Sequence, residues 1–229
     1  MNITVYLGSR CGNRSCYADY AYALGAWIAR HGHTLVYGGS RTGLMGKLAD
    51  GALQAGGQVI GVEPQFFMDE ELQHEGLTKL IVTPDMTSRT QQMMDLGDIF
   101  LAFPGGIGTL EEISQVMSQV KLHQMEGRFA FLDFDGYYQP MKALIQQMSD
   151  EGFVEDRADA VPFLPSFAAL TAFALGRDLP RPGETWRHFK NHMYRILDLA
   201  DDAETGETYV VYKTLYGEYR DFIRPLDMF

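Results

Sequence analysis

Short apolar segments alternate with longer segments of helical periodicity over the first three quarters of the chain. The short segments are apolar on both faces, as in strands of a parallel sheet covered by helices, and fall at residues 3–7, 34–37, 59–62, 80–83, 99–103 and 129–134. Helix-length segments lie between them at residues 18–30, 44–54, 85–96, 110–122 and 138–149, and a last strand–helix unit covers residues 160–175. This alternation predicts an α/β fold: a doubly wound, Rossmann-like, mostly parallel sheet with helices on both faces.

The pattern changes after residue 176. Residues 176–183 hold two prolines and two glycines in eight positions, which is a composition typical of a linker. Beyond them, residues 193–199, 209–215 and 219–226 have the character of strands. We therefore expect a main domain over residues 1–176, a linker over 177–184 and a small β-rich domain, a β-meander, over 185–229.

Composition removes several classes of function. Because 19 Lys and Arg face 30 Asp and Glu, the net charge is −11, and neither a nucleic acid nor an anionic membrane is an expected partner. No apolar run approaches the ~18 residues of a membrane span, and no basic signal-peptide region follows Met1. Cys11 and Cys16 are too few for a disulfide scaffold or a zinc site. We expect a cytoplasmic protein with reduced cysteines, no metal and no cofactor.

The most informative motif is the glycine-rich segment at residues 104–112. It follows one predicted strand and begins the next predicted helix, so its backbone N–H groups can converge on an anion at the helix N-terminus. Gly105, Gly106 and Gly108 permit close approach of a ligand to the backbone, and Thr109 adds a hydroxyl. The alternative is a tight turn without a ligand, which three glycines in four positions make the weaker interpretation.

Two further loops follow predicted strands and belong to the same edge of the sheet, where open parallel sheets bind ligands. One contains Gly8 and Ser9, and the other contains Gly38 and Gly39 and leads into Met45. Neither the P-loop nor the GxGxxG pattern occurs, so the sequence favours neither an ATPase nor a standard NAD site.

Helical geometry separates two adjacent glutamates. At ~100° per residue, Glu111 points away from the apolar stripe of its helix, whereas Glu112 lies at the edge of that stripe and can face a cleft beside the glycine loop. The stripe is predicted to consist of Leu110, Ile113, Val116, Met117 and Val120.

Arg89 shares a helix face with apolar neighbours near the same sheet edge. It can form an i, i+4 pair with Asp85, or it can meet a ligand oxygen or a carboxylate of a partner. Phe66, Phe67 and Met68 are interpreted as core or interface residues rather than as a stacking platform for a base, and Cys11 and Cys16 as ordinary reduced cysteines.

Together these motifs resemble the LOG (Lonely Guy) family of cytokinin-activating phosphoribohydrolases, formerly labelled lysine decarboxylases. The family hallmark Pro-Gly-Gly-x-Gly-Thr-x-x-Glu stands at residues 104–112, and Leu-Val-Tyr-Gly-Gly…Gly-Leu-Met-Gly stands at residues 35–46. The resemblance covers about residues 1–176. Where the family commonly has Arg-Lys, this chain has Arg89 and Thr90. Residues 185–229 resemble a short bacterial domain of unknown function through motifs at 186–190, 204–207 and 224–229.

The resemblance implies hydrolysis of the N-glycosidic bond of a purine nucleoside 5′-monophosphate, including N6-modified cytokinin-type nucleotides. Glu112 and Arg89 would be the catalytic residues, and the loop at residues 105–109 would hold the phosphate. Gly8, Ser9, Gly38, Gly39 and Met45 would border the nucleotide, and the protein would be a homodimer or a higher homo-oligomer. The alternatives are a non-catalytic nucleotide-binding or carrier protein that uses the same loops, and an interaction protein whose β-domain recruits a partner.

Overall fold

The computed structural model describes the chain except for residues 69–71, 155–159, 188–190 and 203–204. It divides into two compact units, Met1–Phe163 and Leu164–Phe229. The C-terminal motifs at 186–190 and 204–207 therefore lie partly outside the described residues. None of the described helices is long and apolar enough to cross a lipid bilayer.

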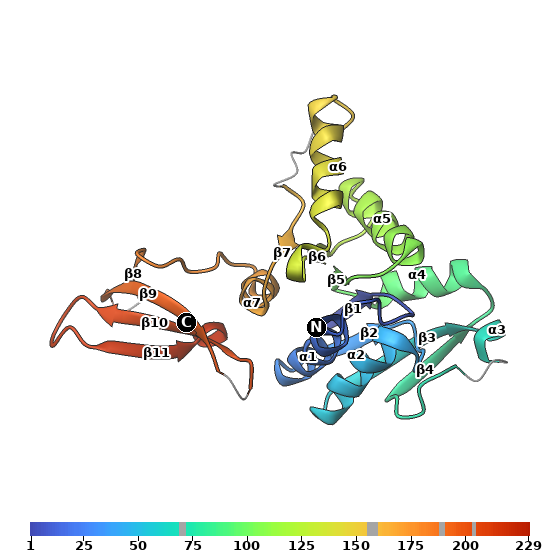
Figure 1. Cartoon of the computed structure of the whole chain (residues 1–229), viewed down its shortest axis with the longest axis horizontal. Coiled ribbons are helices and arrows are strands. Elements are labelled where there is room, and N and C mark those ends of the chain that lie inside the picture. The colour runs from blue at the N-terminus through green and yellow to red at the C-terminus, as the bar shows by residue number, and fades with distance from the viewer. Residues whose placement is uncertain (69–71, 155–159, 188–190, 203–204) are drawn as a thin grey trace. The chain divides into compact units, whose positions relative to one another are not determined.

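The first unit is built around a seven-stranded sheet in the order β4-β3-β2-β1-β5-β6-β7 (Figure 1). Adjacent strands from β4 to β6 are parallel. Chain order runs one way from β1 to β4 and the other way from β5 to β7, so the switch in strand order lies between β1 and β5. This confirms the predicted doubly wound α/β fold. The strands are β1 (Asn2–Tyr6), β2 (Thr34–Tyr37), β3 (Gln58–Pro64), β4 (Lys79–Thr83), β5 (Ile99–Ala102), β6 (Arg128–Leu132) and β7 (Phe163–Leu164).

Helices cover both faces of this sheet (Figure 1). On one side lie α1 (Cys16–Arg30) and α2 (Gly43–Gln54), and on the other lie α4 (Met86–Leu96), α5 (Ile107–Lys121) and α6 (Gln139–Asp150). The central strands are buried because both faces are covered, and β5 is buried at every position. The short helices α3 (Gln65–Met68) and η1 (Phe134–Gly136) follow β3 and β6.

The second unit contains α7 (Phe167–Leu175) and an antiparallel sheet in the order β11-β10-β9-β8. Its strands are β8 (Thr185–Arg187), β9 (Met193–Asp201), β10 (Thr208–Thr214) and β11 (Asp221–Pro225), followed by η3 (Leu226–Met228). The three predicted strands are present, and β8 is an additional one that is too short to give a periodic signal. This sheet confirms the predicted β-rich C-terminal part.

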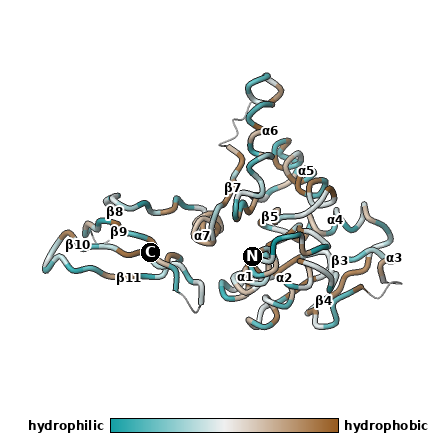
Figure 2. Tube along the Cα trace, in the orientation of Figure 1, coloured by the Kyte–Doolittle hydropathy of each residue, from teal (hydrophilic) through white to brown (hydrophobic). Residues whose placement is uncertain are grey.

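The boundary between the units lies earlier than the one at residue 176 that the sequence analysis expects. Helix α7 is apolar along almost its whole length (Figure 2), and Ala168 on this helix belongs to the same core cluster as Tyr194, Ile196 and Val210. The break in composition at the linker therefore comes after α7, whereas the break in packing comes before it.

Candidate active site

The loops that follow β1 and β5 meet at the switch in strand order. Tyr6 and Ala102 are register partners at the ends of these strands, and just beyond them the N–H of Gly8 donates to the carbonyl oxygen of Pro104 at 3.2 Å. A Cβ on Gly105 would lie 2.9 Å from the backbone nitrogen of Gly8. Glycine at position 105 therefore lets the two loops pack together at the place where open α/β sheets bind ligands.

The loop after β5 ends in the first turn of α5. Gly106 is the N-cap residue, so the N–H groups of the residues after it begin the helix without acceptors from a preceding turn. Around Gly106 and Gly108 no atom lies within 4 Å of an added Cβ, so the backbone of this turn is open to an approaching group. Thr109 is buried, and it lines a cavity beside this turn. The turn has the features of an anion-binding helix N-terminus.

A buried ion pair lies beside this turn. The Nη1 of Arg89 on α4 donates to Oε1 of Glu112 on α5, and the exposed fractions of the two side chains are 8% and 12%. The Nε of Arg89 donates to the carbonyl oxygen of Val62 at 3.3 Å. The guanidinium is therefore held by groups from two other elements, α5 and β3, and it fixes the position of the Glu112 carboxylate.

The surroundings change the acidity of Glu112. Burial raises the pKa of the Glu112 carboxyl above its usual range, and the charge and hydrogen bond of Arg89 act in the opposite direction without cancelling the effect of burial. A carboxylate with a raised pKa is a stronger base than an exposed one, so Glu112 is better suited than an exposed glutamate to accept a proton.

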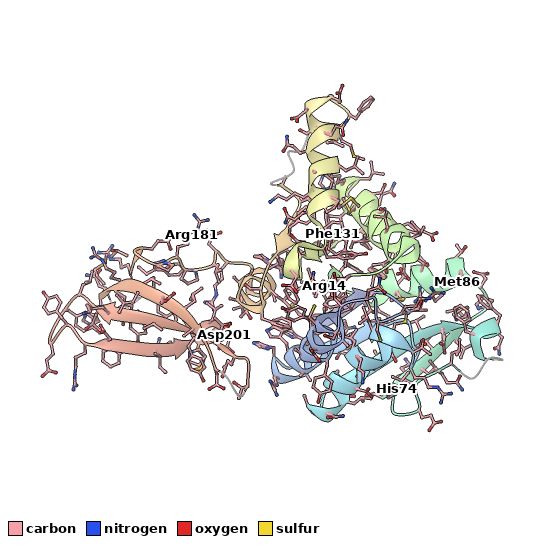
Figure 3. All side chains as sticks on the ribbon, viewed as in Figure 1. Arg14, His74, Met86, Phe131, Arg181 and Asp201 are labelled. Carbon is pink, nitrogen blue, oxygen red and sulfur yellow. The ribbon has the colours of Figure 1, made fainter. Side chains whose placement is uncertain are left out.

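One cavity of about 590 Å³ joins these groups. The polar and charged residues in its lining include Ser9, Arg10, Arg89, Thr109 and Glu112, together with the two glycine loops, whereas much of its remaining wall is apolar. Met86, labelled in Figure 3 at the start of α4, is part of this wall. The apolar residues that line it include Leu7, Tyr17, Leu44, Met45, Phe67, Met86, Ile107 and Tyr137.

The structure brings together most of the residues that the sequence analysis singles out. Arg89, Glu112 and the predicted phosphate-loop residues line this cavity, and so do Gly8 and Ser9 from the loop after β1 and Met45 from the first turn of α2. Gly38 and Gly39 are not among the lining residues. A Cβ on Gly38 would overlap with Nη2 of Arg89, and a Cβ on Gly39 would lie 3.3 Å from the Cβ of Glu63. These two glycines make room for buried side chains.

Two details of the predicted helix faces are corrected. Leu110 is 39% exposed, so the buried stripe of α5 begins at Ile113. Asp85 does not pair with Arg89 but caps α4, where its carboxylate accepts a hydrogen bond from the N–H of Ser88 at 2.8 Å. Thr90 is buried, and its hydroxyl donates to the carbonyl oxygen of Met86 within α4, so its side chain is engaged in the helix and does not line the cavity.

Sequence reasoning missed several residues of the site. The hydroxyl of Tyr137 donates to the carbonyl oxygen of Gly105 at 2.5 Å, and Phe67 lines the cavity while Phe66, its ring partner at 4.5 Å, is 46% exposed. Arg14, labelled in Figure 3, pairs with Asp135 at 2.8 Å, and neither residue is among those that line the cavity. The position of Tyr137 just after β6 was an available signal, because loops at the carboxyl ends of parallel strands share one edge.

Metal ligation does not emerge from the described part of the chain. Within it, no three His, Cys, Asp or Glu side chains are grouped so as to hold a metal ion. Cys11 is exposed at the wall of the cavity, and Cys16 is half-buried; neither forms a disulfide. The groups in the lining that can take part in chemistry include the ion pair, the side chains of Ser9, Arg10 and Thr109, and the backbone of the glycine loops.

Comparison with known proteins gives matches for both parts of the chain. Residues 45–168 match the model of a family described as "Possible lysine decarboxylase", and residues 184–229 match a family of unknown function, DUF1653. A protein of Rhodococcoides fascians named cytokinin riboside 5′-monophosphate phosphoribohydrolase is 42% identical over 67% of this chain and 78% of its own length. A protein of the same name from Oryza sativa subsp. japonica is 36% identical over 90% of this chain and 84% of its own length.

Solved structures of similar fold are more distant in sequence. The molybdenum cofactor carrier protein of Chlamydomonas reinhardtii is 22% identical, with a TM-score of 0.60 over 76% of this chain and 96% of its own. The molybdenum cofactor binding protein of Rippkaea orientalis is also 22% identical, with a TM-score of 0.58 over 76% of this chain and 95% of its own. At this identity the likeness establishes the fold alone.

Proposed function

This chain belongs to the family described as possible lysine decarboxylases, and from that membership and the geometry of its site we propose that it hydrolyses the N-glycosidic bond of a purine nucleoside 5′-monophosphate. The products would be the free base and ribose 5-phosphate. The observation that carries the proposal is the buried Arg89–Glu112 pair in one cavity with the glycine turn at the start of α5. The names of relatives from Rhodococcoides fascians and Oryza sativa support the same reaction.

The glycine turn would bind the 5′-phosphate. Backbone N–H groups after Gly106 and the dipole of α5 favour an anion there. This local arrangement explains how a chain with a net charge of −11 can bind a negatively charged ligand. Phosphate binding would use energy from a remote part of the substrate to place the ribose against the reacting groups.

Glu112 would act at C1′ of the ribose. As the bond from C1′ to the base nitrogen breaks, positive charge develops on the sugar, and a nearby carboxylate stabilises it. The carboxylate would also take a proton from the attacking water, whose oxygen forms the new bond to C1′. The electron pair of the broken bond stays on the base, which leaves after gaining a proton. Arg89 would keep the carboxylate in place.

Lysine decarboxylation fits the site less well, although the family description mentions it. An enzyme that uses pyridoxal phosphate forms a Schiff base through a lysine amine. The chain has six lysines, and none of those in the described part of the chain is among the residues that line the cavity.

The direct test is release of base from adenosine monophosphate and from an N6-prenylated analogue, followed by chromatography, with ribose 5-phosphate measured in the same samples. We expect equal amounts of the two products. Glu112→Gln should lower kcat by at least about 100-fold, the lower end of what a general base contributes, while nucleotide affinity changes little. Glu111→Gln is the matched control, because Glu111 is the exposed neighbour on the same helix.

One outcome would contradict hydrolysis, and another would contradict the role of the ion pair in it. If nucleotides raise the melting temperature of the protein but no base is released from any of them, the chain is a nucleotide-binding or carrier protein. If Glu112→Gln and Glu111→Gln retain the activity of the wild type equally, the reaction does not depend on the Arg89–Glu112 pair.

We also propose that the protein is at least a homodimer, as its family resemblance implies. Apolar side chains at the start of α5 support this, because Ile107 is 82% exposed and Leu110 is 39% exposed, and Ile107 lines the cavity. Light scattering coupled to size-exclusion chromatography should give a mass of at least twice 25.8 kDa; a mass of one chain would contradict it.

A further inference from the structure

Gly38 and Gly39 separate two buried charged side chains. The position of a Cβ on Gly38 is occupied by Nη2 of Arg89, and that of a Cβ on Gly39 lies against the Cβ, Cγ and Cδ of Glu63 at 3.3–3.5 Å. Arg89 reaches this loop from α4, whereas Glu63 reaches it from the carboxyl end of β3. Hydrogen bonds to backbone carbonyl groups hold this arrangement. Arg89 Nε donates to the carbonyl oxygen of Val62, and the Thr83 hydroxyl donates to the backbone carbonyl oxygen of Glu63.

Glu63 is an unusual residue for its location. It is 1% exposed on a strand whose other residues include Val59 and Val62, both fully buried. Neither of its carboxylate oxygens has a hydrogen-bond partner in the described part of the chain. An ionised carboxylate in such a place is costly, and a buried acid relieves the cost by remaining protonated.

The charged and titratable groups around Glu63 come from several elements. Arg89 on α4 acts on it electrostatically, and Tyr37 at the end of β2 faces it with a buried hydroxyl that also has no partner among the described residues. Asp50 on α2 acts on Tyr37 as well. Among these groups, Arg89 is the only cation that acts on Glu63, and Arg89 already forms an ion pair with Glu112.

One cation therefore faces two buried carboxyl groups. If both were ionised, the buried cluster would carry an excess negative charge next to the turn that is to hold a phosphate. With Glu63 neutral, the charge of Arg89 is balanced by Glu112 alone. Since Glu112 has a direct hydrogen bond from Arg89 and Glu63 has none, Glu112 is the group that ionises first.

We propose that Glu63 is held as the neutral acid beneath Gly39 and is a positioning residue, which leaves the charge of Arg89 available to Glu112. Burial raises the pKa of Glu63 above its usual range, with Arg89 acting in the opposite direction, which agrees with this assignment. Ionisation of Glu63 at higher pH would draw Arg89 away from Glu112 and weaken both catalysis and phosphate binding. The catalytic part of this inference rests on the proposed hydrolysis.

The first experiment does not depend on turnover. Carbon-13 NMR of the full-length protein labelled at glutamate Cδ follows each carboxyl through a pH titration, and the Glu63 signal is the one missing in Glu63→Gln. We expect it to titrate above the ordinary glutamate value of about 4.3. The side-chain Nε signal of Arg89 should follow the same titration in the wild type and lose that step in Glu63→Gln. Titration of Glu63 at or below the ordinary value, or an Arg89 signal that does not respond to it, would overturn the proposal.

The second experiment measures kcat and KM against pH. The wild type should lose kcat by at least about fivefold as Glu63 ionises, the lower end of couplings between sites. Glu63→Gln, which remains neutral, should keep its kcat over that range. Glu75→Gln is the matched control, because the Glu75 side chain is 91% exposed, and it should behave as the wild type. An unchanged alkaline decline in Glu63→Gln would overturn the proposal. If no nucleotide releases base, the proposed function fails, and the NMR titration alone decides the role of Glu63.

Discussion

The two glycine-rich loops after β2 and β5 look alike in sequence and differ in what they contact. Both connect a parallel strand to a helix on the same edge of the sheet. The loop after β5 presents Gly106 and Gly108 to open space at the start of α5. The loop after β2 packs Gly38 against Arg89 and Gly39 against Glu63. One loop is an exposed backbone surface for an anion, and the other is a spacer between buried charges.

This difference shows that a missing side chain can have two purposes. A glycine can let a ligand approach the backbone, or it can leave room for a neighbouring side chain of the same protein. The two cases predict opposite results for substitution by alanine: the first affects ligand binding and spares the fold, whereas the second displaces the neighbour.

Among the glycine substitutions, Gly38→Ala should have the largest effect on activity. The added Cβ would overlap with the Arg89 guanidinium, so Arg89 would shift and Glu112 would lose its fixed position. A displacement of about 1 Å in a catalytic group can cost about 100-fold in rate, and we expect a fall in kcat of that order. Steady-state kinetics at saturating nucleotide measures kcat. Gly106→Ala is the comparison, because an added Cβ there meets no protein atom within 4 Å and its place at the phosphate turn should change KM rather than kcat.

The spacer role of Gly38 would be wrong if Gly38→Ala retained a kcat within about twofold of those of Gly106→Ala and the wild type. Circular dichroism and thermal unfolding of both variants would exclude global misfolding as the cause of any loss.

The acid side of the pH profile tests Glu112. Because burial raises the pKa of this carboxyl, protonation should remove the base at a pH above the ordinary glutamate value of about 4.3. Below the raised pKa, kcat should fall about tenfold per pH unit. A decline that begins only below about pH 4.3 would contradict the raised pKa.

Glu112 affects stability and activity in opposite directions: as the pH rises, activity increases, whereas the contribution of this carboxyl to stability falls. The Glu112 carboxyl has a higher pKa in the folded state than in the unfolded state. Its contribution to stability is therefore fully present below about pH 4.3 and is lost as the pH rises through the raised pKa. Thermal unfolding of wild type and Glu112→Gln over this range should therefore show the variant gaining relative stability as the pH rises, while wild-type activity increases.

Gly108→Ala should have a smaller effect, confined to the ligand. Gly108 lies in the first turn of α5, and nothing lies within 4 Å of an added Cβ. Alanine in a helix is favoured over glycine by up to about 1 kcal/mol, so stability should be unchanged or higher. A phosphate bound at this turn would be crowded, and we expect nucleotide Kd to rise several-fold in calorimetry. Unchanged affinity would place the phosphate elsewhere.

Much of the fold followed from the sequence, because the alternation of apolar segments with helical periodicity reports burial directly. The doubly wound sheet and the separate β-rich part are confirmed. Chain periodicity could not reveal that α7 packs with the second unit, since an almost entirely apolar helix can face any core. The same periodicity predicts Leu110 in the buried stripe, although the first turn of α5 extends beyond the core.

The sequence predicts those features of the site that depend on one loop or one helix. It does not predict those that depend on how different elements pack against one another. The glycine turn and the orientation of Glu112 follow from helix geometry. The pairing of Arg89 with Glu112 joins α4 to α5 across 23 positions of sequence, and the burial of Glu63 requires knowing what covers the end of β3. Only the three-dimensional arrangement shows that Gly38 and Gly39 serve these side chains.

A crystal structure of Glu112→Gln with adenosine monophosphate would show whether the turn at the start of α5 binds the phosphate and whether position 112 faces C1′. We predict that the phosphate accepts hydrogen bonds, at about 2.9 Å, from backbone N–H groups of residues 107–109, and that C1′ lies next to Gln at position 112 with room for one water. A phosphate bound away from the start of α5, or a base rather than C1′ beside position 112, would contradict the proposed placement of the nucleotide.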